Sequence, residues 1–507
     1  MKIKIFAIVL IMILSCNCSF ASEIIMDIEQ DNNITSSKDV YWEQINEDGF
    51  GSRYNIAPRG MAIFNDTLVI GTVNAIDFWA GLNTSLTLPE FIRSFITIKL
   101  WKNFLGNGCE IWSYDGTTVR QIVGDTEEAV MKAGFGNKNN GEVGMLISYK
   151  GYLYVGIHNH FEGGQIWRTK DLTEEWELVV TEGFGEKNNE AVWVAEVFND
   201  RLYVGTMNLL KGCEIYRTND GVNWEAVVGG TSEIKKGFGS TANFYAWSMA
   251  VYDNWLYVGT DNLKGGGELW KTQDGVTWKP VLAYRGWIGA KLHGADYPRG
   301  FDAGFLNYRG GIRKMMVYNN ELYCGFCGED VYTNVWLSQY KLFSYRQQDF
   351  LLKLRPFHYR ESQGLEIWKY NATVDEWITL VGGTGKGNFS GGFGDIRNEY
   401  PWGMTTDDQY LYVGTLRLEP MNVLFTFKRN GFLLPHLNIH VDTPIGGAEV
   451  WRFDGRQWIW DRINEQGFGD LNNIGIRGLK IYKDCIIAAT LNLVTGCELW
   501  KLNLSEK

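Results

Sequence analysis

Apolar and polar residues alternate along this chain in short runs that end at turn-forming residues, and the same order of runs keeps returning. Residues 195–239 show the pattern most clearly: "AEVF" precedes an Asn-Asp pair, "LYVGT" a polar loop, "CEIYRT" the triplet Asn-Asp-Gly, and "WEAVV" a glycine-rich connection. Runs rich in β-branched and aromatic residues that are separated by such turns predict β-hairpins. We therefore expect four strands in this segment, which we call strands A to D.

The second and third of these runs recur seven times each, which makes the segment one copy of a repeat. Strand B recurs as "LVIGT" at 68–72, "LYVGI" at 153–157, "LYVGT" at 202–206, 256–260 and 411–415, "LYCGF" at 322–326 and "IIAAT" at 486–490. Strand C recurs as Glu or Gln, an apolar residue, then Trp or Tyr, at 110–112, 165–167, 214–216, 268–270, 366–368, 449–451 and 498–500. Because no segment inside the repeat has helical periodicity, we predict an all-β, seven-bladed β-propeller of four-stranded antiparallel blades.

The two ends of the repeat region complement each other. The last copy stops after strand C, at Lys501 and Leu502, whereas the first copy is preceded by an extra strand D in "VYWEQINEDGFG", residues 40–51. We predict that this N-terminal strand completes the last blade and closes the ring, since closure removes the exposed edges of an open one. The propeller is then expected to span residues 40–503.

Two turns between strands C and D carry a known signature. "TNDGVNW" at 218–224 and "TQDGVTW" at 272–278 resemble the Asp-box hairpin of propellers that include the sialidases and related glycan-active or glycan-binding proteins. The family motif is Ser/Thr-x-Asp-x-Gly-x-Thr-Trp. Here one residue is missing between Asp and Trp, and other copies keep only fragments such as Asp115-Gly116. The resemblance implies the propeller architecture for residues 40–503 and no particular activity.

Residues that return in nearly every copy are predicted to serve folding. One is the Asn that follows each Gly-Phe-Gly at the start of strand A, and its copies are Asn55, Asn140, Asn189, Asn243, Asn398 and Asn473. We expect the glycine to permit a turn, the phenylalanine to pack between blades, and the Asn to bond backbone groups of that turn. A ring of ion-binding asparagines is the alternative. The Glu that opens strand C is likewise expected to be structural.

Ligand binding is expected where the copies differ, and the clearest difference lies four residues after that Asn. The seven copies present Arg59, Gly144, Trp193, Trp247, Arg313, Trp402 and Arg477 at this place. These residues lie on the innermost strands, at the mouth of the central channel of the predicted propeller. The three arginines and three tryptophans predict a site there for an anionic, ring-shaped ligand. Guanidinium groups match carboxylates or phosphates, and indoles stack on sugars. The alternative is structural: the tryptophans line the channel wall and the arginines pair with the strand-C glutamates.

Sialidases also hold a substrate carboxylate with arginines on inner strands, and Arg59 lies near the start of the first inner strand, as their first arginine does. They have six blades, however, and "APRG" at 57–60 is not their Arg-Ile-Pro motif. Their Tyr-Glu nucleophile pair cannot be placed on this sequence. No catalytic residue is therefore predicted from the resemblance, which is left as an analogy.

Three long B–C insertions, at 75–108, 328–364 and 416–447, interrupt copies one, five and six. They are apolar and aromatic with scattered Lys and Arg, as in "FIRSFITIKLWKNF" at 91–104. Segments this long and this apolar are typical of functional elements. We expect a lid over the channel or a protein-docking surface; a membrane-surface contact and simple packing onto the ring are the alternatives.

Two further groups of residues are chemically capable. The long D–A connection of copy four, residues 285–305, carries His293, Asp296, Tyr297 and Arg299. His158 and His160 follow strand B of copy two on alternate positions and can share one face, but no carboxylate partner is evident in the sequence. With only six histidines in the chain, we predict no metal site and no cofactor.

The first residues predict export. Lys2 and Lys4 precede an apolar run at 5–14 that is too short to span a bilayer, which is typical of a secretory signal at 1–21 followed by a linker at 22–39. Cleavage after Ala21 and lipid attachment at Cys16 are both open. Removing residues 1–21 takes two lysines and no acids from a net charge of −11 and leaves −13, which argues against nucleic-acid partners.

These observations favour an exported or cell-surface propeller, expected to be a monomer, that binds glycan or protein at the face bearing the insertions. The alternative is a carbohydrate-active enzyme, a hydrolase or lyase, that uses the arginines and tryptophans at the channel mouth. It requires two carboxylates, or a Tyr with a carboxylate, near Arg59, Arg313 and Arg477. A third candidate is a structural lipoprotein of the cell envelope that is tethered through Cys16.

Overall fold

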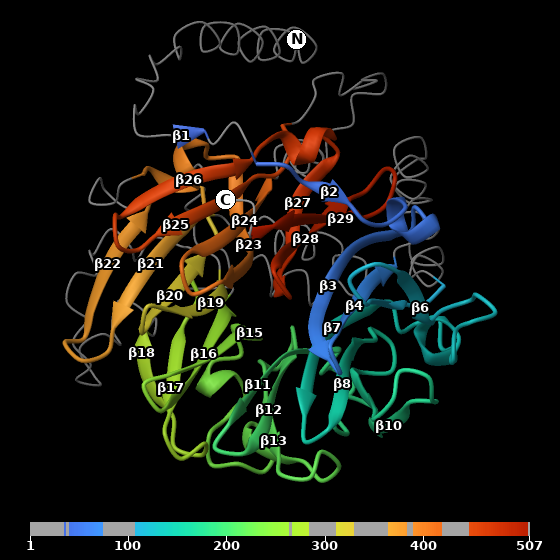
Figure 1. Ribbon diagram of the computed structural model, residues 1–507. Coiled ribbons are helices and arrows are strands. Elements are labelled where there is room, and N and C mark those ends of the chain that lie inside the picture. Colours follow the sequence, from blue (N-terminus) through green and yellow to red (C-terminus); the bar gives the residue numbers. More distant parts are fainter. Residues whose placement is uncertain are drawn as a thin grey trace, which may run out of the picture. The chain divides into compact units, whose positions relative to one another are not determined.

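The computed structural model describes residues 35–36, 40–74, 107–262, 266–282, 311–328, 364–382, 389–417 and 446–504 (Figure 1). The chain divides into two units, residues 1–36 and 37–507. Of the first unit only β1 (Thr35–Ser36) is described, so the predicted signal peptide and Cys16 lie outside the described residues. The described part of the chain contains no helix long and apolar enough to cross a membrane.

The second unit is all-β, as predicted, and its strands follow one another in sets of four. The first three sets are β3 (Asn55–Phe64), β4 (Thr67–Asn74), β5 (Ile111–Tyr114) and β6 (Val119–Val123); β7 (Glu142–Tyr149), β8 (Tyr152–His158), β9 (Gln165–Thr169) and β10 (Glu177–Val180); β11 (Ala191–Phe198), β12 (Arg201–Met207), β13 (Ile215–Thr218) and β14 (Glu225–Val228). The next three are β15 (Asn243–Tyr252), β16 (Trp255–Asn262), β17 (Leu269–Thr272) and β18 (Lys279–Leu282); β19 (Ile312–Tyr318), β20 (Glu321–Phe326), β21 (Glu366–Asn371) and β22 (Glu376–Val381); β23 (Asn398–Thr406), β24 (Leu411–Arg417), β25 (Val450–Asp454) and β26 (Ile459–Asn464). The last set is β27 (Asn473–Tyr482), β28 (Cys485–Asn492), β29 (Leu499–Asn503) and β2 (Glu43–Gln44).

Short 3-10 turns precede the first strand of most sets. They are η1 (Asp48–Gly51), η2 (Ala133–Gly136), η3 (Lys236–Gly239), η5 (Gly391–Gly394) and η6 (Gln466–Gly469), and each contains one Gly-Phe-Gly motif. In η2 both Gly134 and Phe135 have positive φ, 60° and 56°. The glycine therefore permits this turn, as predicted.

Neighbouring strands within a set are antiparallel, and tight hairpins join the first two strands. In the first set Phe64 pairs with Thr67 across Asn65 and Asp66, whose φ angles are 47° and 58°. Positive φ at both central residues is the conformation that an Asn-Asp pair favours between twisted strands. The predicted strand repeat and its hairpin turns are thus confirmed in the described residues.

The last set takes its outermost strand from the other end of the chain. β2 pairs antiparallel with β29, with Glu43 opposite Lys501 and Gln44 opposite Trp500. Ile45 donates its backbone N–H to the carbonyl of Leu499 at 2.9 Å. The strand expected at 40–46 therefore adds to the last set, where strand D is missing from the sequence.

The first strand of each set contacts the first strand of the next. These contacts join β3 to β7, β7 to β11, β11 to β15, β15 to β19, β19 to β23, β23 to β27 and β27 to β3, and we call these seven the inner strands. Apolar cores lie between neighbouring sets: Val69 and Ile111 of the first set pack with Val143 and Leu153 of the second. Each core is therefore shared by two sets.

A repeated group of contacts joins each Gly-Phe-Gly turn to the set that follows it. In the second set the ring of Phe135 stacks on Trp167 with a centroid distance of 4.6 Å. The indole of Trp167 donates to Gln165 Oε1 at 2.9 Å, and the same oxygen accepts from the Asn140 amide at 2.9 Å. Asn140 also donates to the carbonyl of Gly134 at 2.9 Å, so one Asn ties the turn to strand C.

The same contacts recur along the chain. The side-chain amide of each repeated Asn donates to the carbonyl of the glycine that precedes Phe, at Asn55, Asn140, Asn189, Asn243, Asn398 and Asn473. Except for Asn140, these residues also donate to the Glu that opens strand C: Glu110, Glu214, Glu268, Glu449 and Glu498. The prediction that the Asn bonds backbone groups of the turn is confirmed, and a structural role of the strand-C Glu is consistent with these contacts.

Asn243→Asp tests this group of contacts. The amide of Asn243 donates to Glu268 Oε2 at 2.7 Å and to the carbonyl of Gly237 at 2.9 Å, so a carboxylate in its place would face two acceptors in a buried site. We expect the free energy of unfolding to fall by about 3 kcal/mol, as measured by urea denaturation. The control is Asn320→Asp on an exposed hairpin turn, at a place where the first set already has Asp66. The free energy of unfolding of this variant should stay within about 0.5 kcal/mol of the wild-type value. Equal effects of the two variants would contradict the structural role of Asn243.

Candidate functional site

The residues predicted to bind ligand all occupy one kind of backbone position. In each inner strand the register against the hairpin partner shifts by one residue, as between Pro58 and Gly60 in β3. The residue at the shift is Arg59, Gly144, Trp193, Trp247, Arg313, Trp402 or Arg477 in the successive sets, and we call these the bulge positions. Such β-bulges re-aim a side chain and are over-represented next to active sites.

Cation–π contacts join the arginines and tryptophans at the bulge positions. The guanidinium carbon of Arg59 lies 3.2 Å from the ring centroid of Trp193. The corresponding distances are 4.8 Å from Arg313 to Trp247, 5.9 Å from Arg313 to Trp402 and 5.0 Å from Arg477 to Trp402. A guanidinium within about 6 Å of an indole centroid is attracted to its face. The structure therefore brings each of the six predicted residues into contact with at least one other.

A carboxylate that was not predicted lies among these arginines. Glu142 begins β7, where its Oε1 lies 3.7 Å from Arg59 Nη1 and accepts a hydrogen bond from Arg477 Nη2. The other oxygen, Oε2, lies 3.5 Å from Nδ1 of His158. The alternative prediction, that the arginines pair with the strand-C glutamates, is therefore wrong for Arg59 and Arg477.

Arg313 has a different environment from the other two arginines. Its side chain is buried, and no ion pair joins it to a carboxylate in the part of the chain that the structure describes. Among the described residues, neither the Nε of Arg313 nor the Nε of Arg477 makes a hydrogen bond. Of these three buried guanidinium groups, Arg59 and Arg477 thus share Glu142, and Arg313 has no ion pair with a carboxylate among the described residues.

The pKa values show the effect of this excess of positive charge. Burial, followed by the charges of Arg313 and Arg477, holds the pKa of Arg59 well below its ordinary value. Burial and the charge of Arg477 lower the pKa of Arg313 to about 10. Burial raises the pKa of Glu142, but Arg477, a hydrogen bond with His158 and Arg59 outweigh burial and lower that pKa to about 2. Glu142 is therefore ionised at neutral pH.

Aromatic rings connect the bulge positions on the same side. Tyr245 stacks on Trp247 with a centroid distance of 5.5 Å and lies 5.2 Å from Trp193. Tyr400 lies 6.1 Å from Trp247 and 6.4 Å from Trp402. These rings belong to one apolar cluster, so the arginines are held against a rigid aromatic wall.

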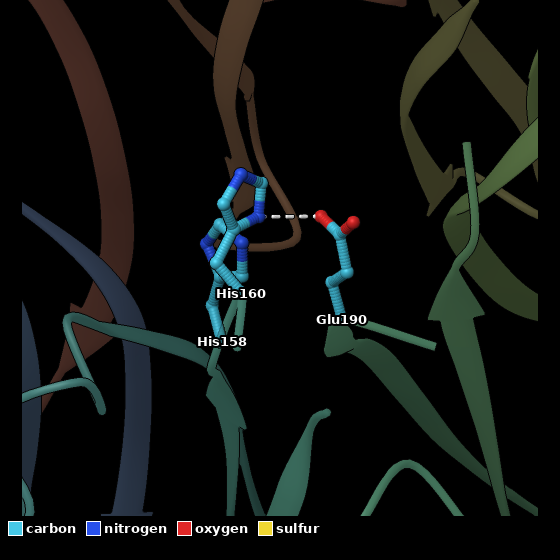
Figure 2. A group of neighbouring side chains, drawn as sticks. All are labelled: His158, His160 and Glu190. Carbon is cyan, nitrogen blue, oxygen red and sulfur yellow. Dashed lines mark ion pairs between the residues drawn. The ribbon is translucent and has the colours of Figure 1, made fainter. Parts of the chain in front are cut away.

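The two histidines do share one face, and the structure supplies the carboxylate that the sequence did not reveal. Figure 2 shows the imidazoles of His158 and His160 close together, with Glu190 pointing toward His160. His160 Nδ1 lies 2.6 Å from Glu190 Oε2, and the centroids of the two imidazoles are 5.6 Å apart. His158 also lies edge-on to Trp193 at 5.7 Å, so this group adjoins the bulge positions.

Other predicted functional segments lie outside the described residues. They are His293, Asp296, Tyr297 and Arg299, together with most of the three insertions, residues 75–106, 329–363 and 418–445.

No protein-family model matches the chain, and no curated protein matches it. Solved structures do resemble it at low identity. An ancestral GH74 enzyme is 9% identical with a TM-score of 0.46; the match covers 89% of this chain, which spans about half the length of that enzyme, 48%. The WD40 β-propeller domain of Doa1 is 8% identical with a TM-score of 0.43, covering 91% of this chain and 96% of that one. An α-L-arabinofuranosidase from Clostridium thermocellum is 12% identical with a TM-score of 0.30, and the match covers 64% of this chain and 93% of that one.

Proposed function

We propose that the chain forms a seven-bladed β-propeller closed by its own N-terminal strand. Two observations support closure. The inner strands contact one another in cyclic order, with β27 returning to β3. In addition, Trp42 lies edge-on to Phe468 at 5.0 Å, as Trp176 does to Phe135 at 5.7 Å in the second set. Trp42 thus takes the place in the last blade that a strand-D tryptophan takes in an uninterrupted one.

The function that this geometry supports best is the binding of an anionic glycan at Arg59, Arg313 and Arg477. The observation that carries the proposal is the burial of three guanidinium groups, of which only Arg59 and Arg477 pair with a carboxylate among the described residues. An unpaired buried cation costs several kcal/mol, and a carboxylate or sulfate on a ligand would offset that cost through charge-assisted hydrogen bonds. Trp193, Trp247 and Trp402 would then stack on the sugar rings that carry the acid.

Arg313→Met tests the proposal and separates binding from folding. On an array of acidic and neutral oligosaccharides, we expect the variant to lose at least about 100-fold in affinity for the acidic ligands. Because Arg313 lacks a carboxylate partner among the described residues, its removal should leave the melting temperature unchanged or higher. Arg120→Met, which removes an exposed arginine from β6, is the matched control and should bind like the wild type. Failure of the wild type to bind any acidic glycan, or equal binding by Arg313→Met, would overturn the proposal.

A carbohydrate-active enzyme is the second candidate, and one observation favours it. This candidate requires a carboxylate, with a Tyr or a second carboxylate, beside the arginines. Glu142 lies between Arg59 and Arg477, and the half-buried Tyr245 lies close enough for the charges of Arg59 and Glu142 to act on its pKa. New reducing ends or unsaturated products from a bound acidic oligosaccharide would support catalysis. Binding of the oligosaccharide without any product would instead favour a protein that binds glycan and does not cleave it.

We propose that the chain is exported and acts outside the cytoplasm or at the cell envelope, as a monomer with no nucleic-acid partner. The basic and apolar start of the chain supports export. Mass spectrometry of the mature N-terminus distinguishes the two processing routes. A chain that begins with lipidated Cys16 would favour the cell-envelope lipoprotein, and one that begins at Ser22 would favour free secretion.

A further inference from the structure

The side chains of His158, His160 and Glu190 form a group whose donor atoms converge. One nitrogen of each imidazole and one carboxylate oxygen of Glu190 all lie within 4.8 Å of one another (Figure 2). The side chains are buried, with 7%, 5% and 10% of their surfaces exposed. Burial among aromatic rings lowers the local dielectric and strengthens any interaction of these donors with a cation.

Main-chain pairing with two neighbouring strands and a hydrogen-bonded turn hold this group in place. His158 pairs with Glu142 of β7 on one side and with Ala191 of β11 on the other. Between the two histidines, Asn159 donates its backbone N–H to the carbonyl of Glu190 at 2.8 Å. The side-chain oxygen of Asn159 accepts the N–H groups of Phe161 and Glu162 at 3.1 and 2.9 Å, which fixes the turn after His160. The donors are thus pre-organised by strands and a bonded turn.

The other sets supply an internal comparison. At the place of His158 they have mostly apolar residues: Val73, Met207, Asp261, Cys327, Leu416 and Leu491. At the place of His160 the described residues are Leu209 and Leu493. Most of these side chains pack in the apolar cluster around Trp193 and Trp247. The blade scaffold therefore accepts apolar residues at both places, and the second set alone replaces both with imidazoles among the described residues.

We propose that His158, His160 and Glu190 bind a divalent transition-metal ion of the Zn²⁺ class. Two imidazoles and one carboxylate are a donor set that Zn²⁺ favours, and three protein ligands leave a coordination position open for water or for a ligand oxygen. Small side-chain movements would bring the donors to the usual metal–ligand distances of about 2.0–2.2 Å. The ion would stand between the second and third inner strands, next to Trp193.

Glu142 has a positioning role in this proposal. Its Oε2 lies 3.5 Å from Nδ1 of His158, and the other ring nitrogen, Nε2, is the one that we assign to the metal. A carboxylate that holds the second nitrogen of a metal-binding imidazole sets the orientation of the ring. Because Glu142 also contacts Arg59 and Arg477, the metal site and the arginine cluster share a residue. Metal binding by itself, however, does not depend on the proposed glycan.

The test is Zn²⁺ binding by the full chain after chelator treatment, measured by isothermal titration calorimetry. We expect one equivalent to bind to the wild type and to raise its melting temperature. His158→Met and His160→Leu install residues that the third set has at these places, Met207 and Leu209, so both variants should fold. Each of these variants, and Glu190→Gln as well, should lose at least about 100-fold in Zn²⁺ affinity, since loss of an outer-shell partner alone costs about 10–100-fold. Co²⁺ bound in place of Zn²⁺ should show visible absorption in the wild type that these variants lack.

Glu399→Gln is the matched control, since Glu399 occupies the place of Glu190 in the sixth set. This variant should bind Zn²⁺ like the wild type. The proposal is overturned if the wild type binds no Zn²⁺, or if His158→Met, His160→Leu and Glu190→Gln bind it as the wild type does. Loss of glycan binding in Arg313→Met with Zn²⁺ binding retained would show that the two proposals succeed or fail separately.

Discussion

Glu142→Gln is expected to lower the free energy of unfolding by about 3–5 kcal/mol at neutral pH. Glu142 is the one carboxylate that pairs with Arg59 and Arg477 among the described residues, and glutamine keeps its size but not its charge. Removing that charge leaves Arg59, Arg313 and Arg477 to repel one another in a buried site. Urea denaturation of the wild type and the variant measures the difference.

The effect should depend on pH in a defined direction. Arg477, His158 and Arg59 outweigh burial and hold the pKa of Glu142 at about 2 in the folded state, compared with 4.5 for an unperturbed glutamate. Because the folded-state pKa is the lower one, Glu142 stabilises the fold fully above pH 4.5 and loses this contribution as the pH falls toward 2. The difference between the wild type and Glu142→Gln should therefore shrink by about 3 kcal/mol over this range.

Two variants control for other effects of the substitution. Glu177 pairs with Arg168 at 2.7 Å in the same set, but its side chain is 56% exposed, so Glu177→Gln should cost less than about 1 kcal/mol. Adding Arg313→Met to Glu142→Gln should recover part of the lost stability, because one of the repelling charges is gone. If Glu142→Gln cost no more than Glu177→Gln, repulsion among the three buried arginines would not control the stability of this site.

The strand repeat could be predicted from the sequence because each part of it has a local chemical reason. Leu202–Thr206 is a run of β-formers, Asn199 and Asp200 form a tight turn, and Asn189 bonds the turn that precedes it. These preferences act over a few residues, so they are visible without knowing the tertiary structure. Their return in other copies made the predicted strand sets clear.

The bulge positions could also be predicted, although the bulge itself could not. Aligning the copies placed Arg59, Arg313 and Arg477 at one position of the repeat, and the structure shows that this position is the bulge. The alignment identified residues that differ from copy to copy. It carried no information on backbone register, which depends on the pairing of each inner strand with its hairpin partner.

The two carboxylates at the site were missed for a different reason. Glu142 lies 335 residues from Arg477 in the sequence, and the two meet because β27, β3 and β7 are successive inner strands. Glu190 meets His160 across the boundary between the second and third sets. Both contacts join different copies of the repeat, so they depend on how the sets pack together and not on the pattern within one copy.

Deletion of residues 40–46 is expected to destabilise the whole second unit. These residues contain β2, whose backbone bonds to β29, and Trp42, whose indole donates to the carbonyl of Ile463 in β26 at 3.0 Å. Trp42 also packs in a buried cluster with Val450 of the sixth set and Leu502 of the last. Without this segment β29 becomes an exposed edge and the core between these two sets is open to water.

Graded variants separate the loss of β2 from a general effect of shortening the chain. Trp42→Ala alone should cost about 3–5 kcal/mol, because it removes a large buried side chain and leaves a cavity. The deletion of 40–46 should cost more than Trp42→Ala, since it also removes the strand pairing. Deleting 22–28 instead removes the same number of residues outside β2 and should leave the melting temperature within a few degrees of the wild type. If the deletion of 40–46 behaved like that of 22–28, β2 would not close the propeller, because a strand that seals a ring of blades cannot be removed without exposing the cores on both sides of it.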